Sequence, residues 1–373
     1  MMAVSRADTS VLGRWWWTVD RQTLGAVGLL IGFGYILVLA SSPSVAERIG
    51  DARDTLIVKQ VVFLALGGVV MTGISLLSPR DIRRLALAGG VAAMLLTAAT
   101  LVIGVEILGA RRWIQMPGFA MQPSEFLKPC FAVITAWLLA EHRRNPRFPG
   151  ALIAGGIFLL IVLLLKEQPD VGMTVVIAAV FFAQLFVDGL SLFLAGIGVL
   201  LMAGGALGSY LMFTHVQARV AEFLHPHGPH TYQVTTALEA FGNGGLWGRG
   251  PGGGRIKDIL PDAHADFVFA VAGEEFGLVI CAVIIGVFAF IVLRGLLRLL
   301  GEPDPFTVLA CTGLLVGFGL QAFVNMASSL ELIPTKGMTL PFISYGGSSV
   351  IAVALGMGML LALTRRRARG ELP

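Results

Sequence analysis

The chain has 373 residues, of which 56% are hydrophobic and only 13% are charged, and its mean hydropathy is +0.82. Soluble domains carry about 25% charged residues, so this composition excludes that class and indicates a multi-span membrane protein. The formal charge of +4 comes mostly from arginines beside apolar runs, and no nucleic-acid partner is expected.

Ten apolar runs follow one another along the chain. Each is close to the roughly 20 residues that a helix needs to cross the hydrocarbon core. Their length and their lack of alternating polarity exclude a membrane β-barrel. We therefore expect an all-α integral membrane protein, a single polytopic domain over residues 1–373. The expected spans are 22–42, 57–78, 84–105, 124–140, 149–166, 170–187, 189–213, 266–297, 305–329 and 341–364.

Arginines set the expected orientation, because short cytoplasmic loops carry an excess of basic residues. With the N-terminus inside, 15 of the 27 basic residues lie on cytoplasmic segments. Both termini are then cytoplasmic, and the polar, glycine-rich segment 214–265 is one large extracytoplasmic loop. The 15 residues are Arg6, Arg14, Arg21, Arg80, Arg83, Arg84, Arg143, Arg144, Arg147, Arg294, Arg298, Arg365, Arg366, Arg367 and Arg369.

Charged residues at membrane depth are costly unless they are paired or hydrated, so they indicate a polar cavity or pathway. The first such group is GARRWIQMPGFAMQPSEFLKP, where Pro123 is typical of a helix start. Glu125 and Lys128 then share one helix face and could simply form a structural ion pair. Alternatively, Lys128 and Arg112 bind phosphate oxygens while Trp113 packs on a sugar or a lipid.

The second group is KEQPDVG, between the fifth and sixth runs. Its charged side chains, Lys166, Glu167 and Asp170, could form a solvated turn. Alternatively, Asp170 faces inward and orients the basic residues.

The third group begins with Asp266, at the end of the large loop. We expect a helix to begin near Pro261, with Asp262 as its cap, so that Asp266 lies in the first turns, near the positive end of the helix dipole. Glu274 is then offset roughly 80° from Asp266 and Glu275 about 180°. One acid can flank the same cavity, while the other needs its own partner. From its position alone, Asp266 could be a second cap.

The fourth group is ELIPTKGMTLPFISYGGSS, whose prolines and glycines keep the backbone irregular beside a span. Irregular backbone at that depth is tolerated only against protein or a wet cavity. The side chains that could line such a cavity are Lys336, Ser344, Tyr345, Ser348 and Ser349.

The large loop itself contains eight glycines between Gly242 and Gly254. They could form a nest that binds an anion such as pyrophosphate. Equally, they could give a mobile loop room to close over a substrate. The loop histidines of HPHGPH are too loosely spaced to favour zinc.

Taken together, GARRWI with QPSEFLKP, KEQPDVG, HADFVFAVAGEEFG and PTKGMTLPFISYGGSS resemble the SEDS family of membrane glycosyltransferases, which polymerise peptidoglycan from lipid II. The resemblance runs over nearly the whole chain in the family's order. The segment PTKGMTLPFISYGG is more similar to the division members of the family than to its elongation members. The resemblance implies the SEDS fold, a place in the bacterial inner membrane at the division septum, and a class B penicillin-binding transpeptidase and other division proteins as partners.

The family's motifs also imply roles for single residues. The catalytic aspartate of its HxDF motif corresponds to Asp266, although Ala265 stands where a threonine is common. Its cavity residues correspond to Arg112, Trp113, Glu125 and Lys128.

Glycosyl transfer from lipid II releases undecaprenyl pyrophosphate, whose developing charge is stabilised by cations or by a divalent metal, Mg or Mn. The acceptor hydroxyl needs a general base within hydrogen-bond reach, and Asp266 suits that role. A single inverting displacement then gives β-1,4 glycan strands. The candidates for binding the anions are Arg112, Lys128, Arg219 and Lys257, and the other candidates for substrate binding are Asp170, Glu274, Lys336 and Ser344.

Two other classes of function stay open. A lipid II flippase needs a polar route across the midplane, which Glu274 and Glu275 could begin, yet the ionisable residues cluster on the outer half. A non-catalytic division scaffold would recruit the transpeptidase through its apolar spans and the tail TRRRAR.

Overall fold

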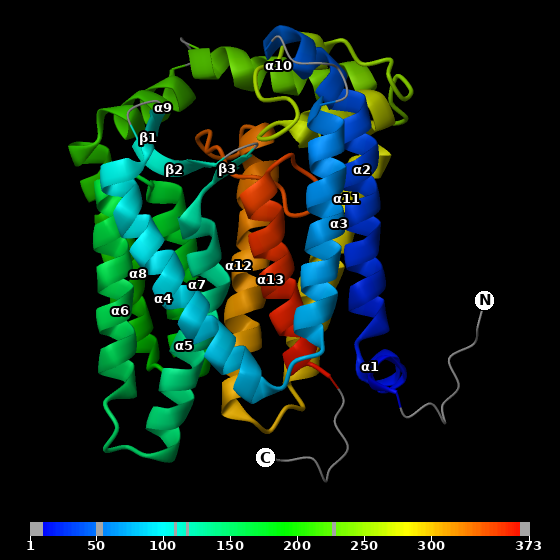
Figure 1. The fold of residues 1–373 in the computed structure, drawn as a ribbon. Helices are drawn as coiled ribbons and strands as arrows, with labels where there is room; N and C mark the ends of the chain where they lie inside the picture. Colours follow the sequence, from blue (N-terminus) through cyan, green and yellow to red (C-terminus); the bar gives the residue numbers. More distant parts are fainter. Residues whose placement is uncertain (1–9, 50–54, 108–109, 117–118, 226–228, 366–373) are drawn as a thin grey trace.

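The computed structural model describes residues 10–49, 55–107, 110–116, 119–225 and 229–365. Each of the ten predicted runs overlaps one long helix, which confirms the helical membrane architecture (Figure 1), although the last run begins six residues before its helix. The matching helices are α2 (Arg21–Ile49), α3 (Thr55–Ser75), α4 (Pro79–Ile103), α5 (Pro123–Arg144), α6 (Gly150–Glu167), α7 (Val171–Val187), α8 (Leu192–Met212), α11 (Val268–Leu299), α12 (Pro305–Ser329) and α13 (Gly347–Leu363).

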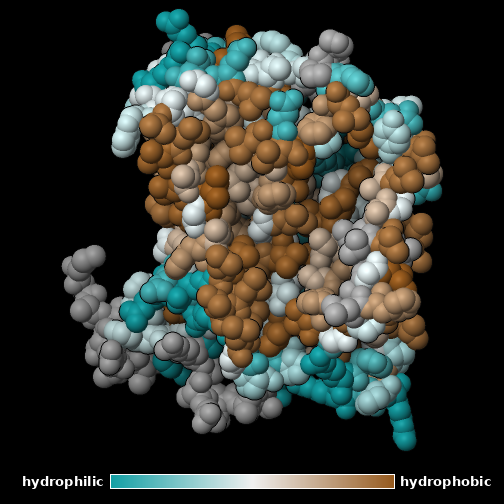
Figure 2. All heavy atoms as spheres, turned by 180° about the vertical axis from the view of Figure 1, so that it is seen from behind, coloured by the Kyte–Doolittle hydropathy of each residue, from teal (hydrophilic) through white to brown (hydrophobic). Residues whose placement is uncertain are grey.

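Within the described ranges, six helices are long and apolar enough to cross a membrane. A bent pair, Gly196–Met212 with Val216–Leu224, adds a seventh if it counts as one span. The helices α7 and α13 are apolar but shorter, and α5 carries charges near both ends. Figure 2 shows the corresponding surface, a broad brown apolar band between hydrophilic ends. The chain is a multi-pass membrane protein.

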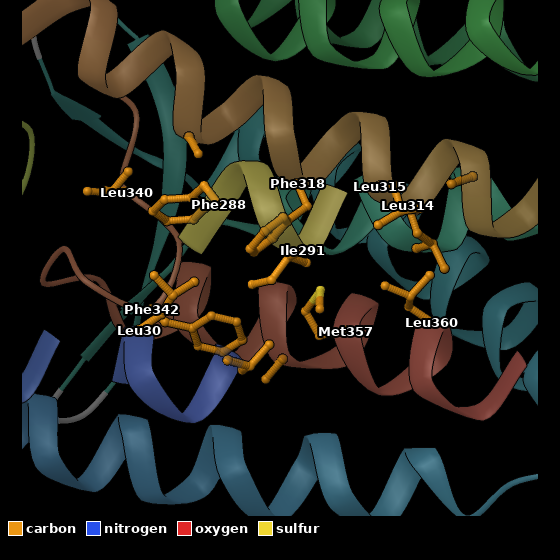
Figure 3. Close-up of a cluster of buried hydrophobic side chains, with 14 of the residues drawn as sticks. Leu30, Phe288, Ile291, Leu314, Leu315, Phe318, Leu340, Phe342, Met357 and Leu360 are labelled. Carbon is orange, nitrogen blue, oxygen red and sulfur yellow. The ribbon is translucent and has the colours of Figure 1, made fainter. Parts of the chain in front are cut away.

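The helices α2, α11, α12 and α13 share a hydrophobic core (Figure 3). Phe288 of α11 packs against Phe318 of α12, with ring centroids 5.4 Å apart. Phe342 is fully buried beside them although its φ of 63° is left-handed. Its carbonyl lies so close to α2 that a Cβ on Gly34 would be 2.1 Å from it. A glycine is therefore required where the irregular segment before α13 approaches α2.

A small antiparallel sheet connects α4 to α5, in the order β1 (Val105–Ile107), β2 (Ala110–Met116), β3 (Phe119–Met121). Val105 pairs with Trp113, and Ile114 pairs with Met121. The all-α prediction missed this sheet, because strands of three to seven residues give too short an alternation to detect. The sheet sets the positions of Arg112 and Trp113, which are neighbours on β2.

The predicted loop 214–265 is largely helical. It contains α9 (Thr214–Leu224), α10 (Pro229–Gly244) and the 3₁₀ turn η1 (Ile256–Asp258). In Figure 1, α9 and α10 lie across the end of the bundle that also carries β1 and β2. The segment predicted as one large loop thus contains two helices and a 3₁₀ turn and covers that end of the bundle.

The short helix α1 (Val11–Thr18) lies at the opposite end of the bundle (Figure 1). There the Arg365 guanidinium donates to the Thr18 hydroxyl at 3.2 Å and to the Leu76 carbonyl at 3.1 Å. Both described ends of the chain are thus on one side, as the arginine pattern requires. Arg6 and the tail arginines Arg366, Arg367 and Arg369 lie outside the described residues.

Candidate active site

Asp266 lies in a turn directly before α11, and its side chain is half-buried. The expected helix start near Pro261 is wrong. Asp262 has a φ of 52°, which is incompatible with the first turn of a right-handed helix, and α11 begins only at Val268. Asp262 is therefore not a helix cap, and Asp266 precedes the helix instead of lying in its first turns.

The backbone of this turn is held by an amide of α12. The Asn325 side chain donates to the Asp266 carbonyl at 2.9 Å and to the Met338 carbonyl at 2.6 Å. One buried side chain thus joins the turn to the irregular segment before α13. Its effect is to fix the position of Asp266 relative to that segment.

Ser344 makes a second connection between the same segments. Its hydroxyl donates to the Ala265 carbonyl at 2.5 Å and accepts from the Leu340 backbone N–H at 2.7 Å. The Tyr345 N–H donates to the His264 carbonyl at 2.9 Å. The predicted irregular segment is confirmed. The Ser344 hydroxyl contacts the backbone beside Asp266, and its contact with substrate stays a prediction.

The Asp266 carboxylate has an unusual electrostatic environment. Among the described residues, no side chain forms a hydrogen bond or ion pair with it. Burial, together with the charge of Asp262, raises the pKa of Asp266 to about 6, although Lys336 and Arg219 act in the opposite direction. A Cβ on Gly337 would lie 2.7 Å from Asp266 Oδ2, so the glycine leaves room for the carboxylate.

Asp170 is the centre of a second set of contacts nearby. Lys336 Nζ lies 2.9 Å from Asp170 Oδ1, and an Arg112 guanidinium nitrogen lies 3.6 Å from Oδ2. The carboxylate also caps α7 by accepting from the Met173 N–H. Burial raises the pKa of Asp170, but the charges of Lys336 and then Arg112 outweigh it and hold the pKa below its usual value. Asp170 therefore faces inward and orients two cations.

Arg112 is fixed by two backbone acceptors as well. Its guanidinium donates to the Gln168 carbonyl at 2.9 Å and to the Pro169 carbonyl at 2.6 Å. Because β2 carries both residues, Trp113 lies next to it, half-buried. The strand and the turn before α7 thus determine where the Arg112 charge lies.

Arg219 of α9 completes this group, since it interacts electrostatically with Arg112, Asp266 and Asp170. We call the five side chains Asp170, Asp266, Arg112, Arg219 and Lys336 the Asp266 cluster. Beside it is a pocket lined by α9, α10 and the segment before α13, with Arg219 and Thr335 in its wall.

Glu125 and Lys128 form a buried ion pair at 2.7 Å, as one of the two interpretations predicts. Lys128 Nζ also donates to Gln321 at 2.5 Å, and Gln321 donates in turn to the Thr339 carbonyl at 3.0 Å. The pair lines a small pocket between α5, α7, α12 and α13. Through the Gln321 amide, the pair is connected to the segment that carries Lys336.

Lys257 and Glu274 are not part of the Asp266 cluster. Glu274 accepts from the backbone N–H groups of Arg255 at 3.1 Å and Ile256 at 2.9 Å. Lys257 Nζ lies 2.6 Å from the Glu275 carboxylate. Glu274 and Glu275 are fully buried. They hold the glycine-rich loop, residues 245–255, which follows α10. These contacts give Lys257 and Glu274 a structural role, and the roles in substrate binding predicted for them stay predictions.

Sequence reasoning missed two functional positions on α12, Gln321 and Asn325. They are four residues apart, so both amides lie on the same helix face. Two amides at this spacing inside an apolar span are a detectable signal, because buried polar groups need partners.

The Asp266 cluster combines one carboxylate whose pKa is raised towards neutrality with three cations, two of which are held by Asp170. Such a carboxylate can accept a proton near neutral pH. The cations can stabilise negative charge that develops on a phosphate. This combination is suited to the transfer of a group from a phosphate ester to a hydroxyl.

The chain is similar to known proteins over nearly its full length. It is 47% identical to a protein of Caulobacter vibrioides named probable peptidoglycan glycosyltransferase FtsW, over 98% of this chain and 94% of the relative. A relative of the same name in Saccharophagus degradans is 36% identical over 95% of both chains.

Two solved structures share the fold. A chain of a peptidoglycan synthase complex described as coordinating polymerization and crosslinking superimposes with a TM-score of 0.78 at 28% identity, covering 93% of this chain and 97% of that one. RodA of Thermus thermophilus, a rod shape determining protein, superimposes with a TM-score of 0.69 at 27% identity, covering 94% of this chain and 97% of that one. The family model of cell cycle proteins that includes FtsW, RodA and SpoVE matches residues 21–369. The chain therefore belongs to the FtsW/RodA/SpoVE family of cell cycle proteins.

Proposed function

We propose that this protein is a peptidoglycan glycosyltransferase that polymerises lipid II into β-1,4 glycan strands, with Asp266 as the general base. The observation that carries this proposal is the Asp266 carboxylate, which has a raised pKa and lies among cations without a pairing partner in the described part of the chain. The names of the curated relatives support the same activity.

The reaction is a single displacement at the anomeric carbon. The acceptor hydroxyl oxygen forms the new bond to that carbon while the bond to the pyrophosphate oxygen breaks. The hydroxyl proton passes to Asp266, and undecaprenyl pyrophosphate leaves as an anion. Because its pKa is low, pyrophosphate needs no strong acid to leave, so one carboxylate suffices, unlike the pair used by glycosidases.

The charge of the Asp266 cluster changes in the direction that this step needs. With both carboxylates ionised, three cations and two anions give the cluster a net charge of +1. When Asp266 accepts the proton, the net charge becomes +2 as negative charge develops on the leaving group. Arg219 and Lys336 are thus suited to stabilise the pyrophosphate after the transfer.

A divalent cation, Mg or Mn, is a further part of the proposal. Mg²⁺ is commonly held by one or two carboxylates together with substrate phosphates, and Asp266 is a carboxylate of that kind. No group of three or more His, Cys, Asp or Glu side chains within the described residues is arranged to hold a metal ion. An ion here would therefore depend on the oxygens of the substrate.

The cellular role that we propose is septal wall synthesis, at the division site of the bacterial inner membrane. The expected partners are a class B penicillin-binding transpeptidase and other division proteins. The division role is supported by the segment PTKGMTLPFISYGG and by the FtsW names of the relatives. A transpeptidase partner is supported by the likeness to a chain of a peptidoglycan synthase complex.

The test uses the full-length protein, reconstituted with its transpeptidase in vesicles that carry fluorescent lipid II on the outer leaflet. The native protein should produce glycan strands resolved by length on a gel, and Asp266→Asn should produce none. At a pH well above the pKa of Asp266, where a change in that pKa leaves the rate unaltered, Asp262→Asn is the matched control, because Asp262 lies in the same turn but is exposed. Strand growth by Asp266→Asn at the native rate would remove Asp266 as the base.

The same preparation separates the other two functions. Transbilayer movement of labelled lipid II without strand growth would indicate a flippase. A scaffold would bind the transpeptidase without either activity. Both outcomes contradict the polymerase proposal, provided that the protein is folded, which its thermal unfolding reports.

A further inference from the structure

Helix α11 is interrupted at Gly277, which has a φ of 78°. The interruption leaves peptide groups on both sides without helical partners, and the glycine-rich loop after α10 supplies them. Before the break, the Glu274 carbonyl accepts from the Arg249 N–H at 2.9 Å. After it, the Leu278 N–H donates to the Gly245 carbonyl at 2.9 Å. The loop thus completes the hydrogen bonding of the broken helix.

Close packing makes this loop rigid. A Cβ on Gly248, whose φ is 80°, would lie 2.2 Å from the Glu275 carbonyl oxygen. A Cβ on Gly277 would lie 2.3 Å from the Leu246 carbonyl oxygen. The Glu275 carboxylate accepts from the Gly252 N–H at 2.9 Å as well. Both roles considered from the sequence are disfavoured. The loop N–H groups that an anion-binding nest would use already donate to Glu274 and Glu275, and the close packing leaves a mobile lid no room to move.

The tip of the loop presents two large apolar side chains outward. Leu246 is 62% exposed and Trp247 is 80% exposed, although the neighbouring loop residues are glycine, asparagine and arginine. We call this pair the Leu246–Trp247 tip. An exposed tryptophan on a rigid loop contributes little to the stability of the fold. A contact outside the protein therefore explains its exposure better.

The tip is continuous with the lipid-facing surface of α11. The Val279 N–H donates to the Leu246 carbonyl at 3.3 Å, and Leu278 and Val279 are themselves 43% and 39% exposed. Before the break, residues 268–275 are all buried. The exposed side chains of α11 after the break are apolar. The surface that faces lipid therefore begins at the level of the tip.

The length of α11 after the break places the membrane boundary at the same level. The 22 residues of α11 after Gly277 span about 33 Å at 1.5 Å per residue, close to the roughly 30 Å of the hydrocarbon core. The outer boundary of the core is therefore near Gly277. Tryptophan is enriched at that boundary, because its ring is apolar and its N–H bonds to water and headgroups.

We propose that the Leu246–Trp247 tip inserts into the outer-leaflet interface of the bilayer and that the interrupted helix transmits this anchor to the active site. Glu274 and Glu275 join the loop to the first segment of α11, and Asp266 directly precedes that segment. The anchor thereby sets the height of Asp266 above the bilayer, where a membrane-linked pyrophosphate must reach it. Continuity with the lipid-facing side of α11 favours lipid over a partner protein as the occupant.

The test measures the depth of the tip. Trp247→Cys is labelled with an environment-sensitive fluorophore in vesicles of phosphatidylethanolamine and phosphatidylglycerol; the three native cysteines are buried and free, so labelling is selective. Quenching by headgroup nitroxide lipid should exceed quenching by mid-chain nitroxide lipid and by aqueous iodide. Phe290→Cys, 43% exposed on the middle of α11, is the control that mid-chain nitroxide should quench most.

Strong iodide quenching with none from headgroup nitroxide would place the tip in water and overturn the proposal. Loss of the lipid quenching when the transpeptidase is added would make that protein the occupant and overturn it as well. As a second measurement, Trp247→Ser should reduce strand growth severalfold and Trp247→Phe much less. That activity result rests on the proposed function, whereas the quenching result does not, so the two can fail separately.

Discussion

The ammonium of Lys336 lies 2.9 Å from the carboxylate of Asp170, although 166 positions separate the two residues. The contact joins the turn before α7 to the irregular segment before α13, and so connects the two segments that flank Asp266. A glycine makes the approach possible, because a Cβ on Gly172 would lie 1.9 Å from Lys336 Cε. The stem of the lysine lies directly on the backbone of α7.

Gly172→Ala should therefore displace Lys336 and lower the rate of strand growth. The ammonium would lose its contact with Asp170, and its position relative to Asp266 would change. We expect a loss in kcat/KM of roughly tenfold, within the roughly 100-fold that a misplacement of about 1 Å can cost. Gly155→Ala is the matched control, because no atom lies within 4 Å of a Cβ there. An unchanged rate for Gly172→Ala would show that the position of Lys336 does not matter to the reaction.

The pH dependence of strand growth should report Asp266. Burial raises its pKa to about 6, and a general base works only when ionised, so the rate should rise through pH 6 and level off above it. At pH 5 about nine-tenths of the carboxylate is protonated. Asp262→Asn removes a charge that raises the pKa of Asp266, so it should move this limb to lower pH. If the midpoint of this limb is the same in Asp262→Asn as in the native protein, the titration belongs to another group.

Asp266→Asn should stabilise the folded protein at neutral pH. Burial raises the pKa of Asp266 from 3.8 to about 6, so the folded state binds the proton more tightly than the unfolded state. Stability therefore decreases as pH rises from about 4 to 6 and stays lower above that range. The thermal midpoint of Asp266→Asn should exceed that of the native protein at pH 7.5, and the difference should vanish near pH 4. A constant difference at both pH values would exclude this linkage.

Much of the fold could be predicted from the sequence, because length and hydropathy determine where a chain crosses a membrane. Each of the ten runs contains a helix, and the segment before α13 is irregular, as its prolines and glycines indicate. The start of α11 could not be predicted, because Asp262 adopts a left-handed conformation that depends on tertiary contacts. The helices α9 and α10 were missed because polarity alone does not distinguish a loop from a helix at an interface.

The candidate site was only partly predictable for a related reason. Charged residue types indicated Asp266, Asp170, Arg112 and Lys336, but spacing along the chain does not say which acid meets which base. Glu274 illustrates this, since the helical angle placed it beside Asp266, whereas its partners are backbone N–H groups of the preceding loop. The loop lies against α11 because it completes the hydrogen bonding at the break at Gly277. A regular helical period does not predict such a break.

Paired substitutions can separate the two interpretations of Glu125 and Lys128. Lys128→Ala leaves Glu125 buried without its partner, and breaking a buried ion pair costs about 3 to 5 kcal/mol, so the thermal midpoint should decrease strongly. The double variant Glu125→Gln with Lys128→Met should recover most of the stability. If the pair is structural, the double variant also recovers strand growth. A stable double variant with a raised KM for lipid II would instead place Lys128 on the substrate anions.

Ser344→Ala tests whether this hydroxyl positions Asp266 or contacts substrate. The Ser344 hydroxyl bonds the buried Leu340 N–H and the part-buried Ala265 carbonyl, and its loss leaves both without this partner, at a cost of about 1 to 3 kcal/mol. The turn carrying Asp266 would loosen, so kcat should decrease while the KM for lipid II stays near the native value. Ser191→Ala, which removes a hydroxyl that caps α8, serves as the control for a lost hydroxyl elsewhere. A raised KM with native kcat would instead return Ser344 to the substrate-binding role that its sequence position suggested.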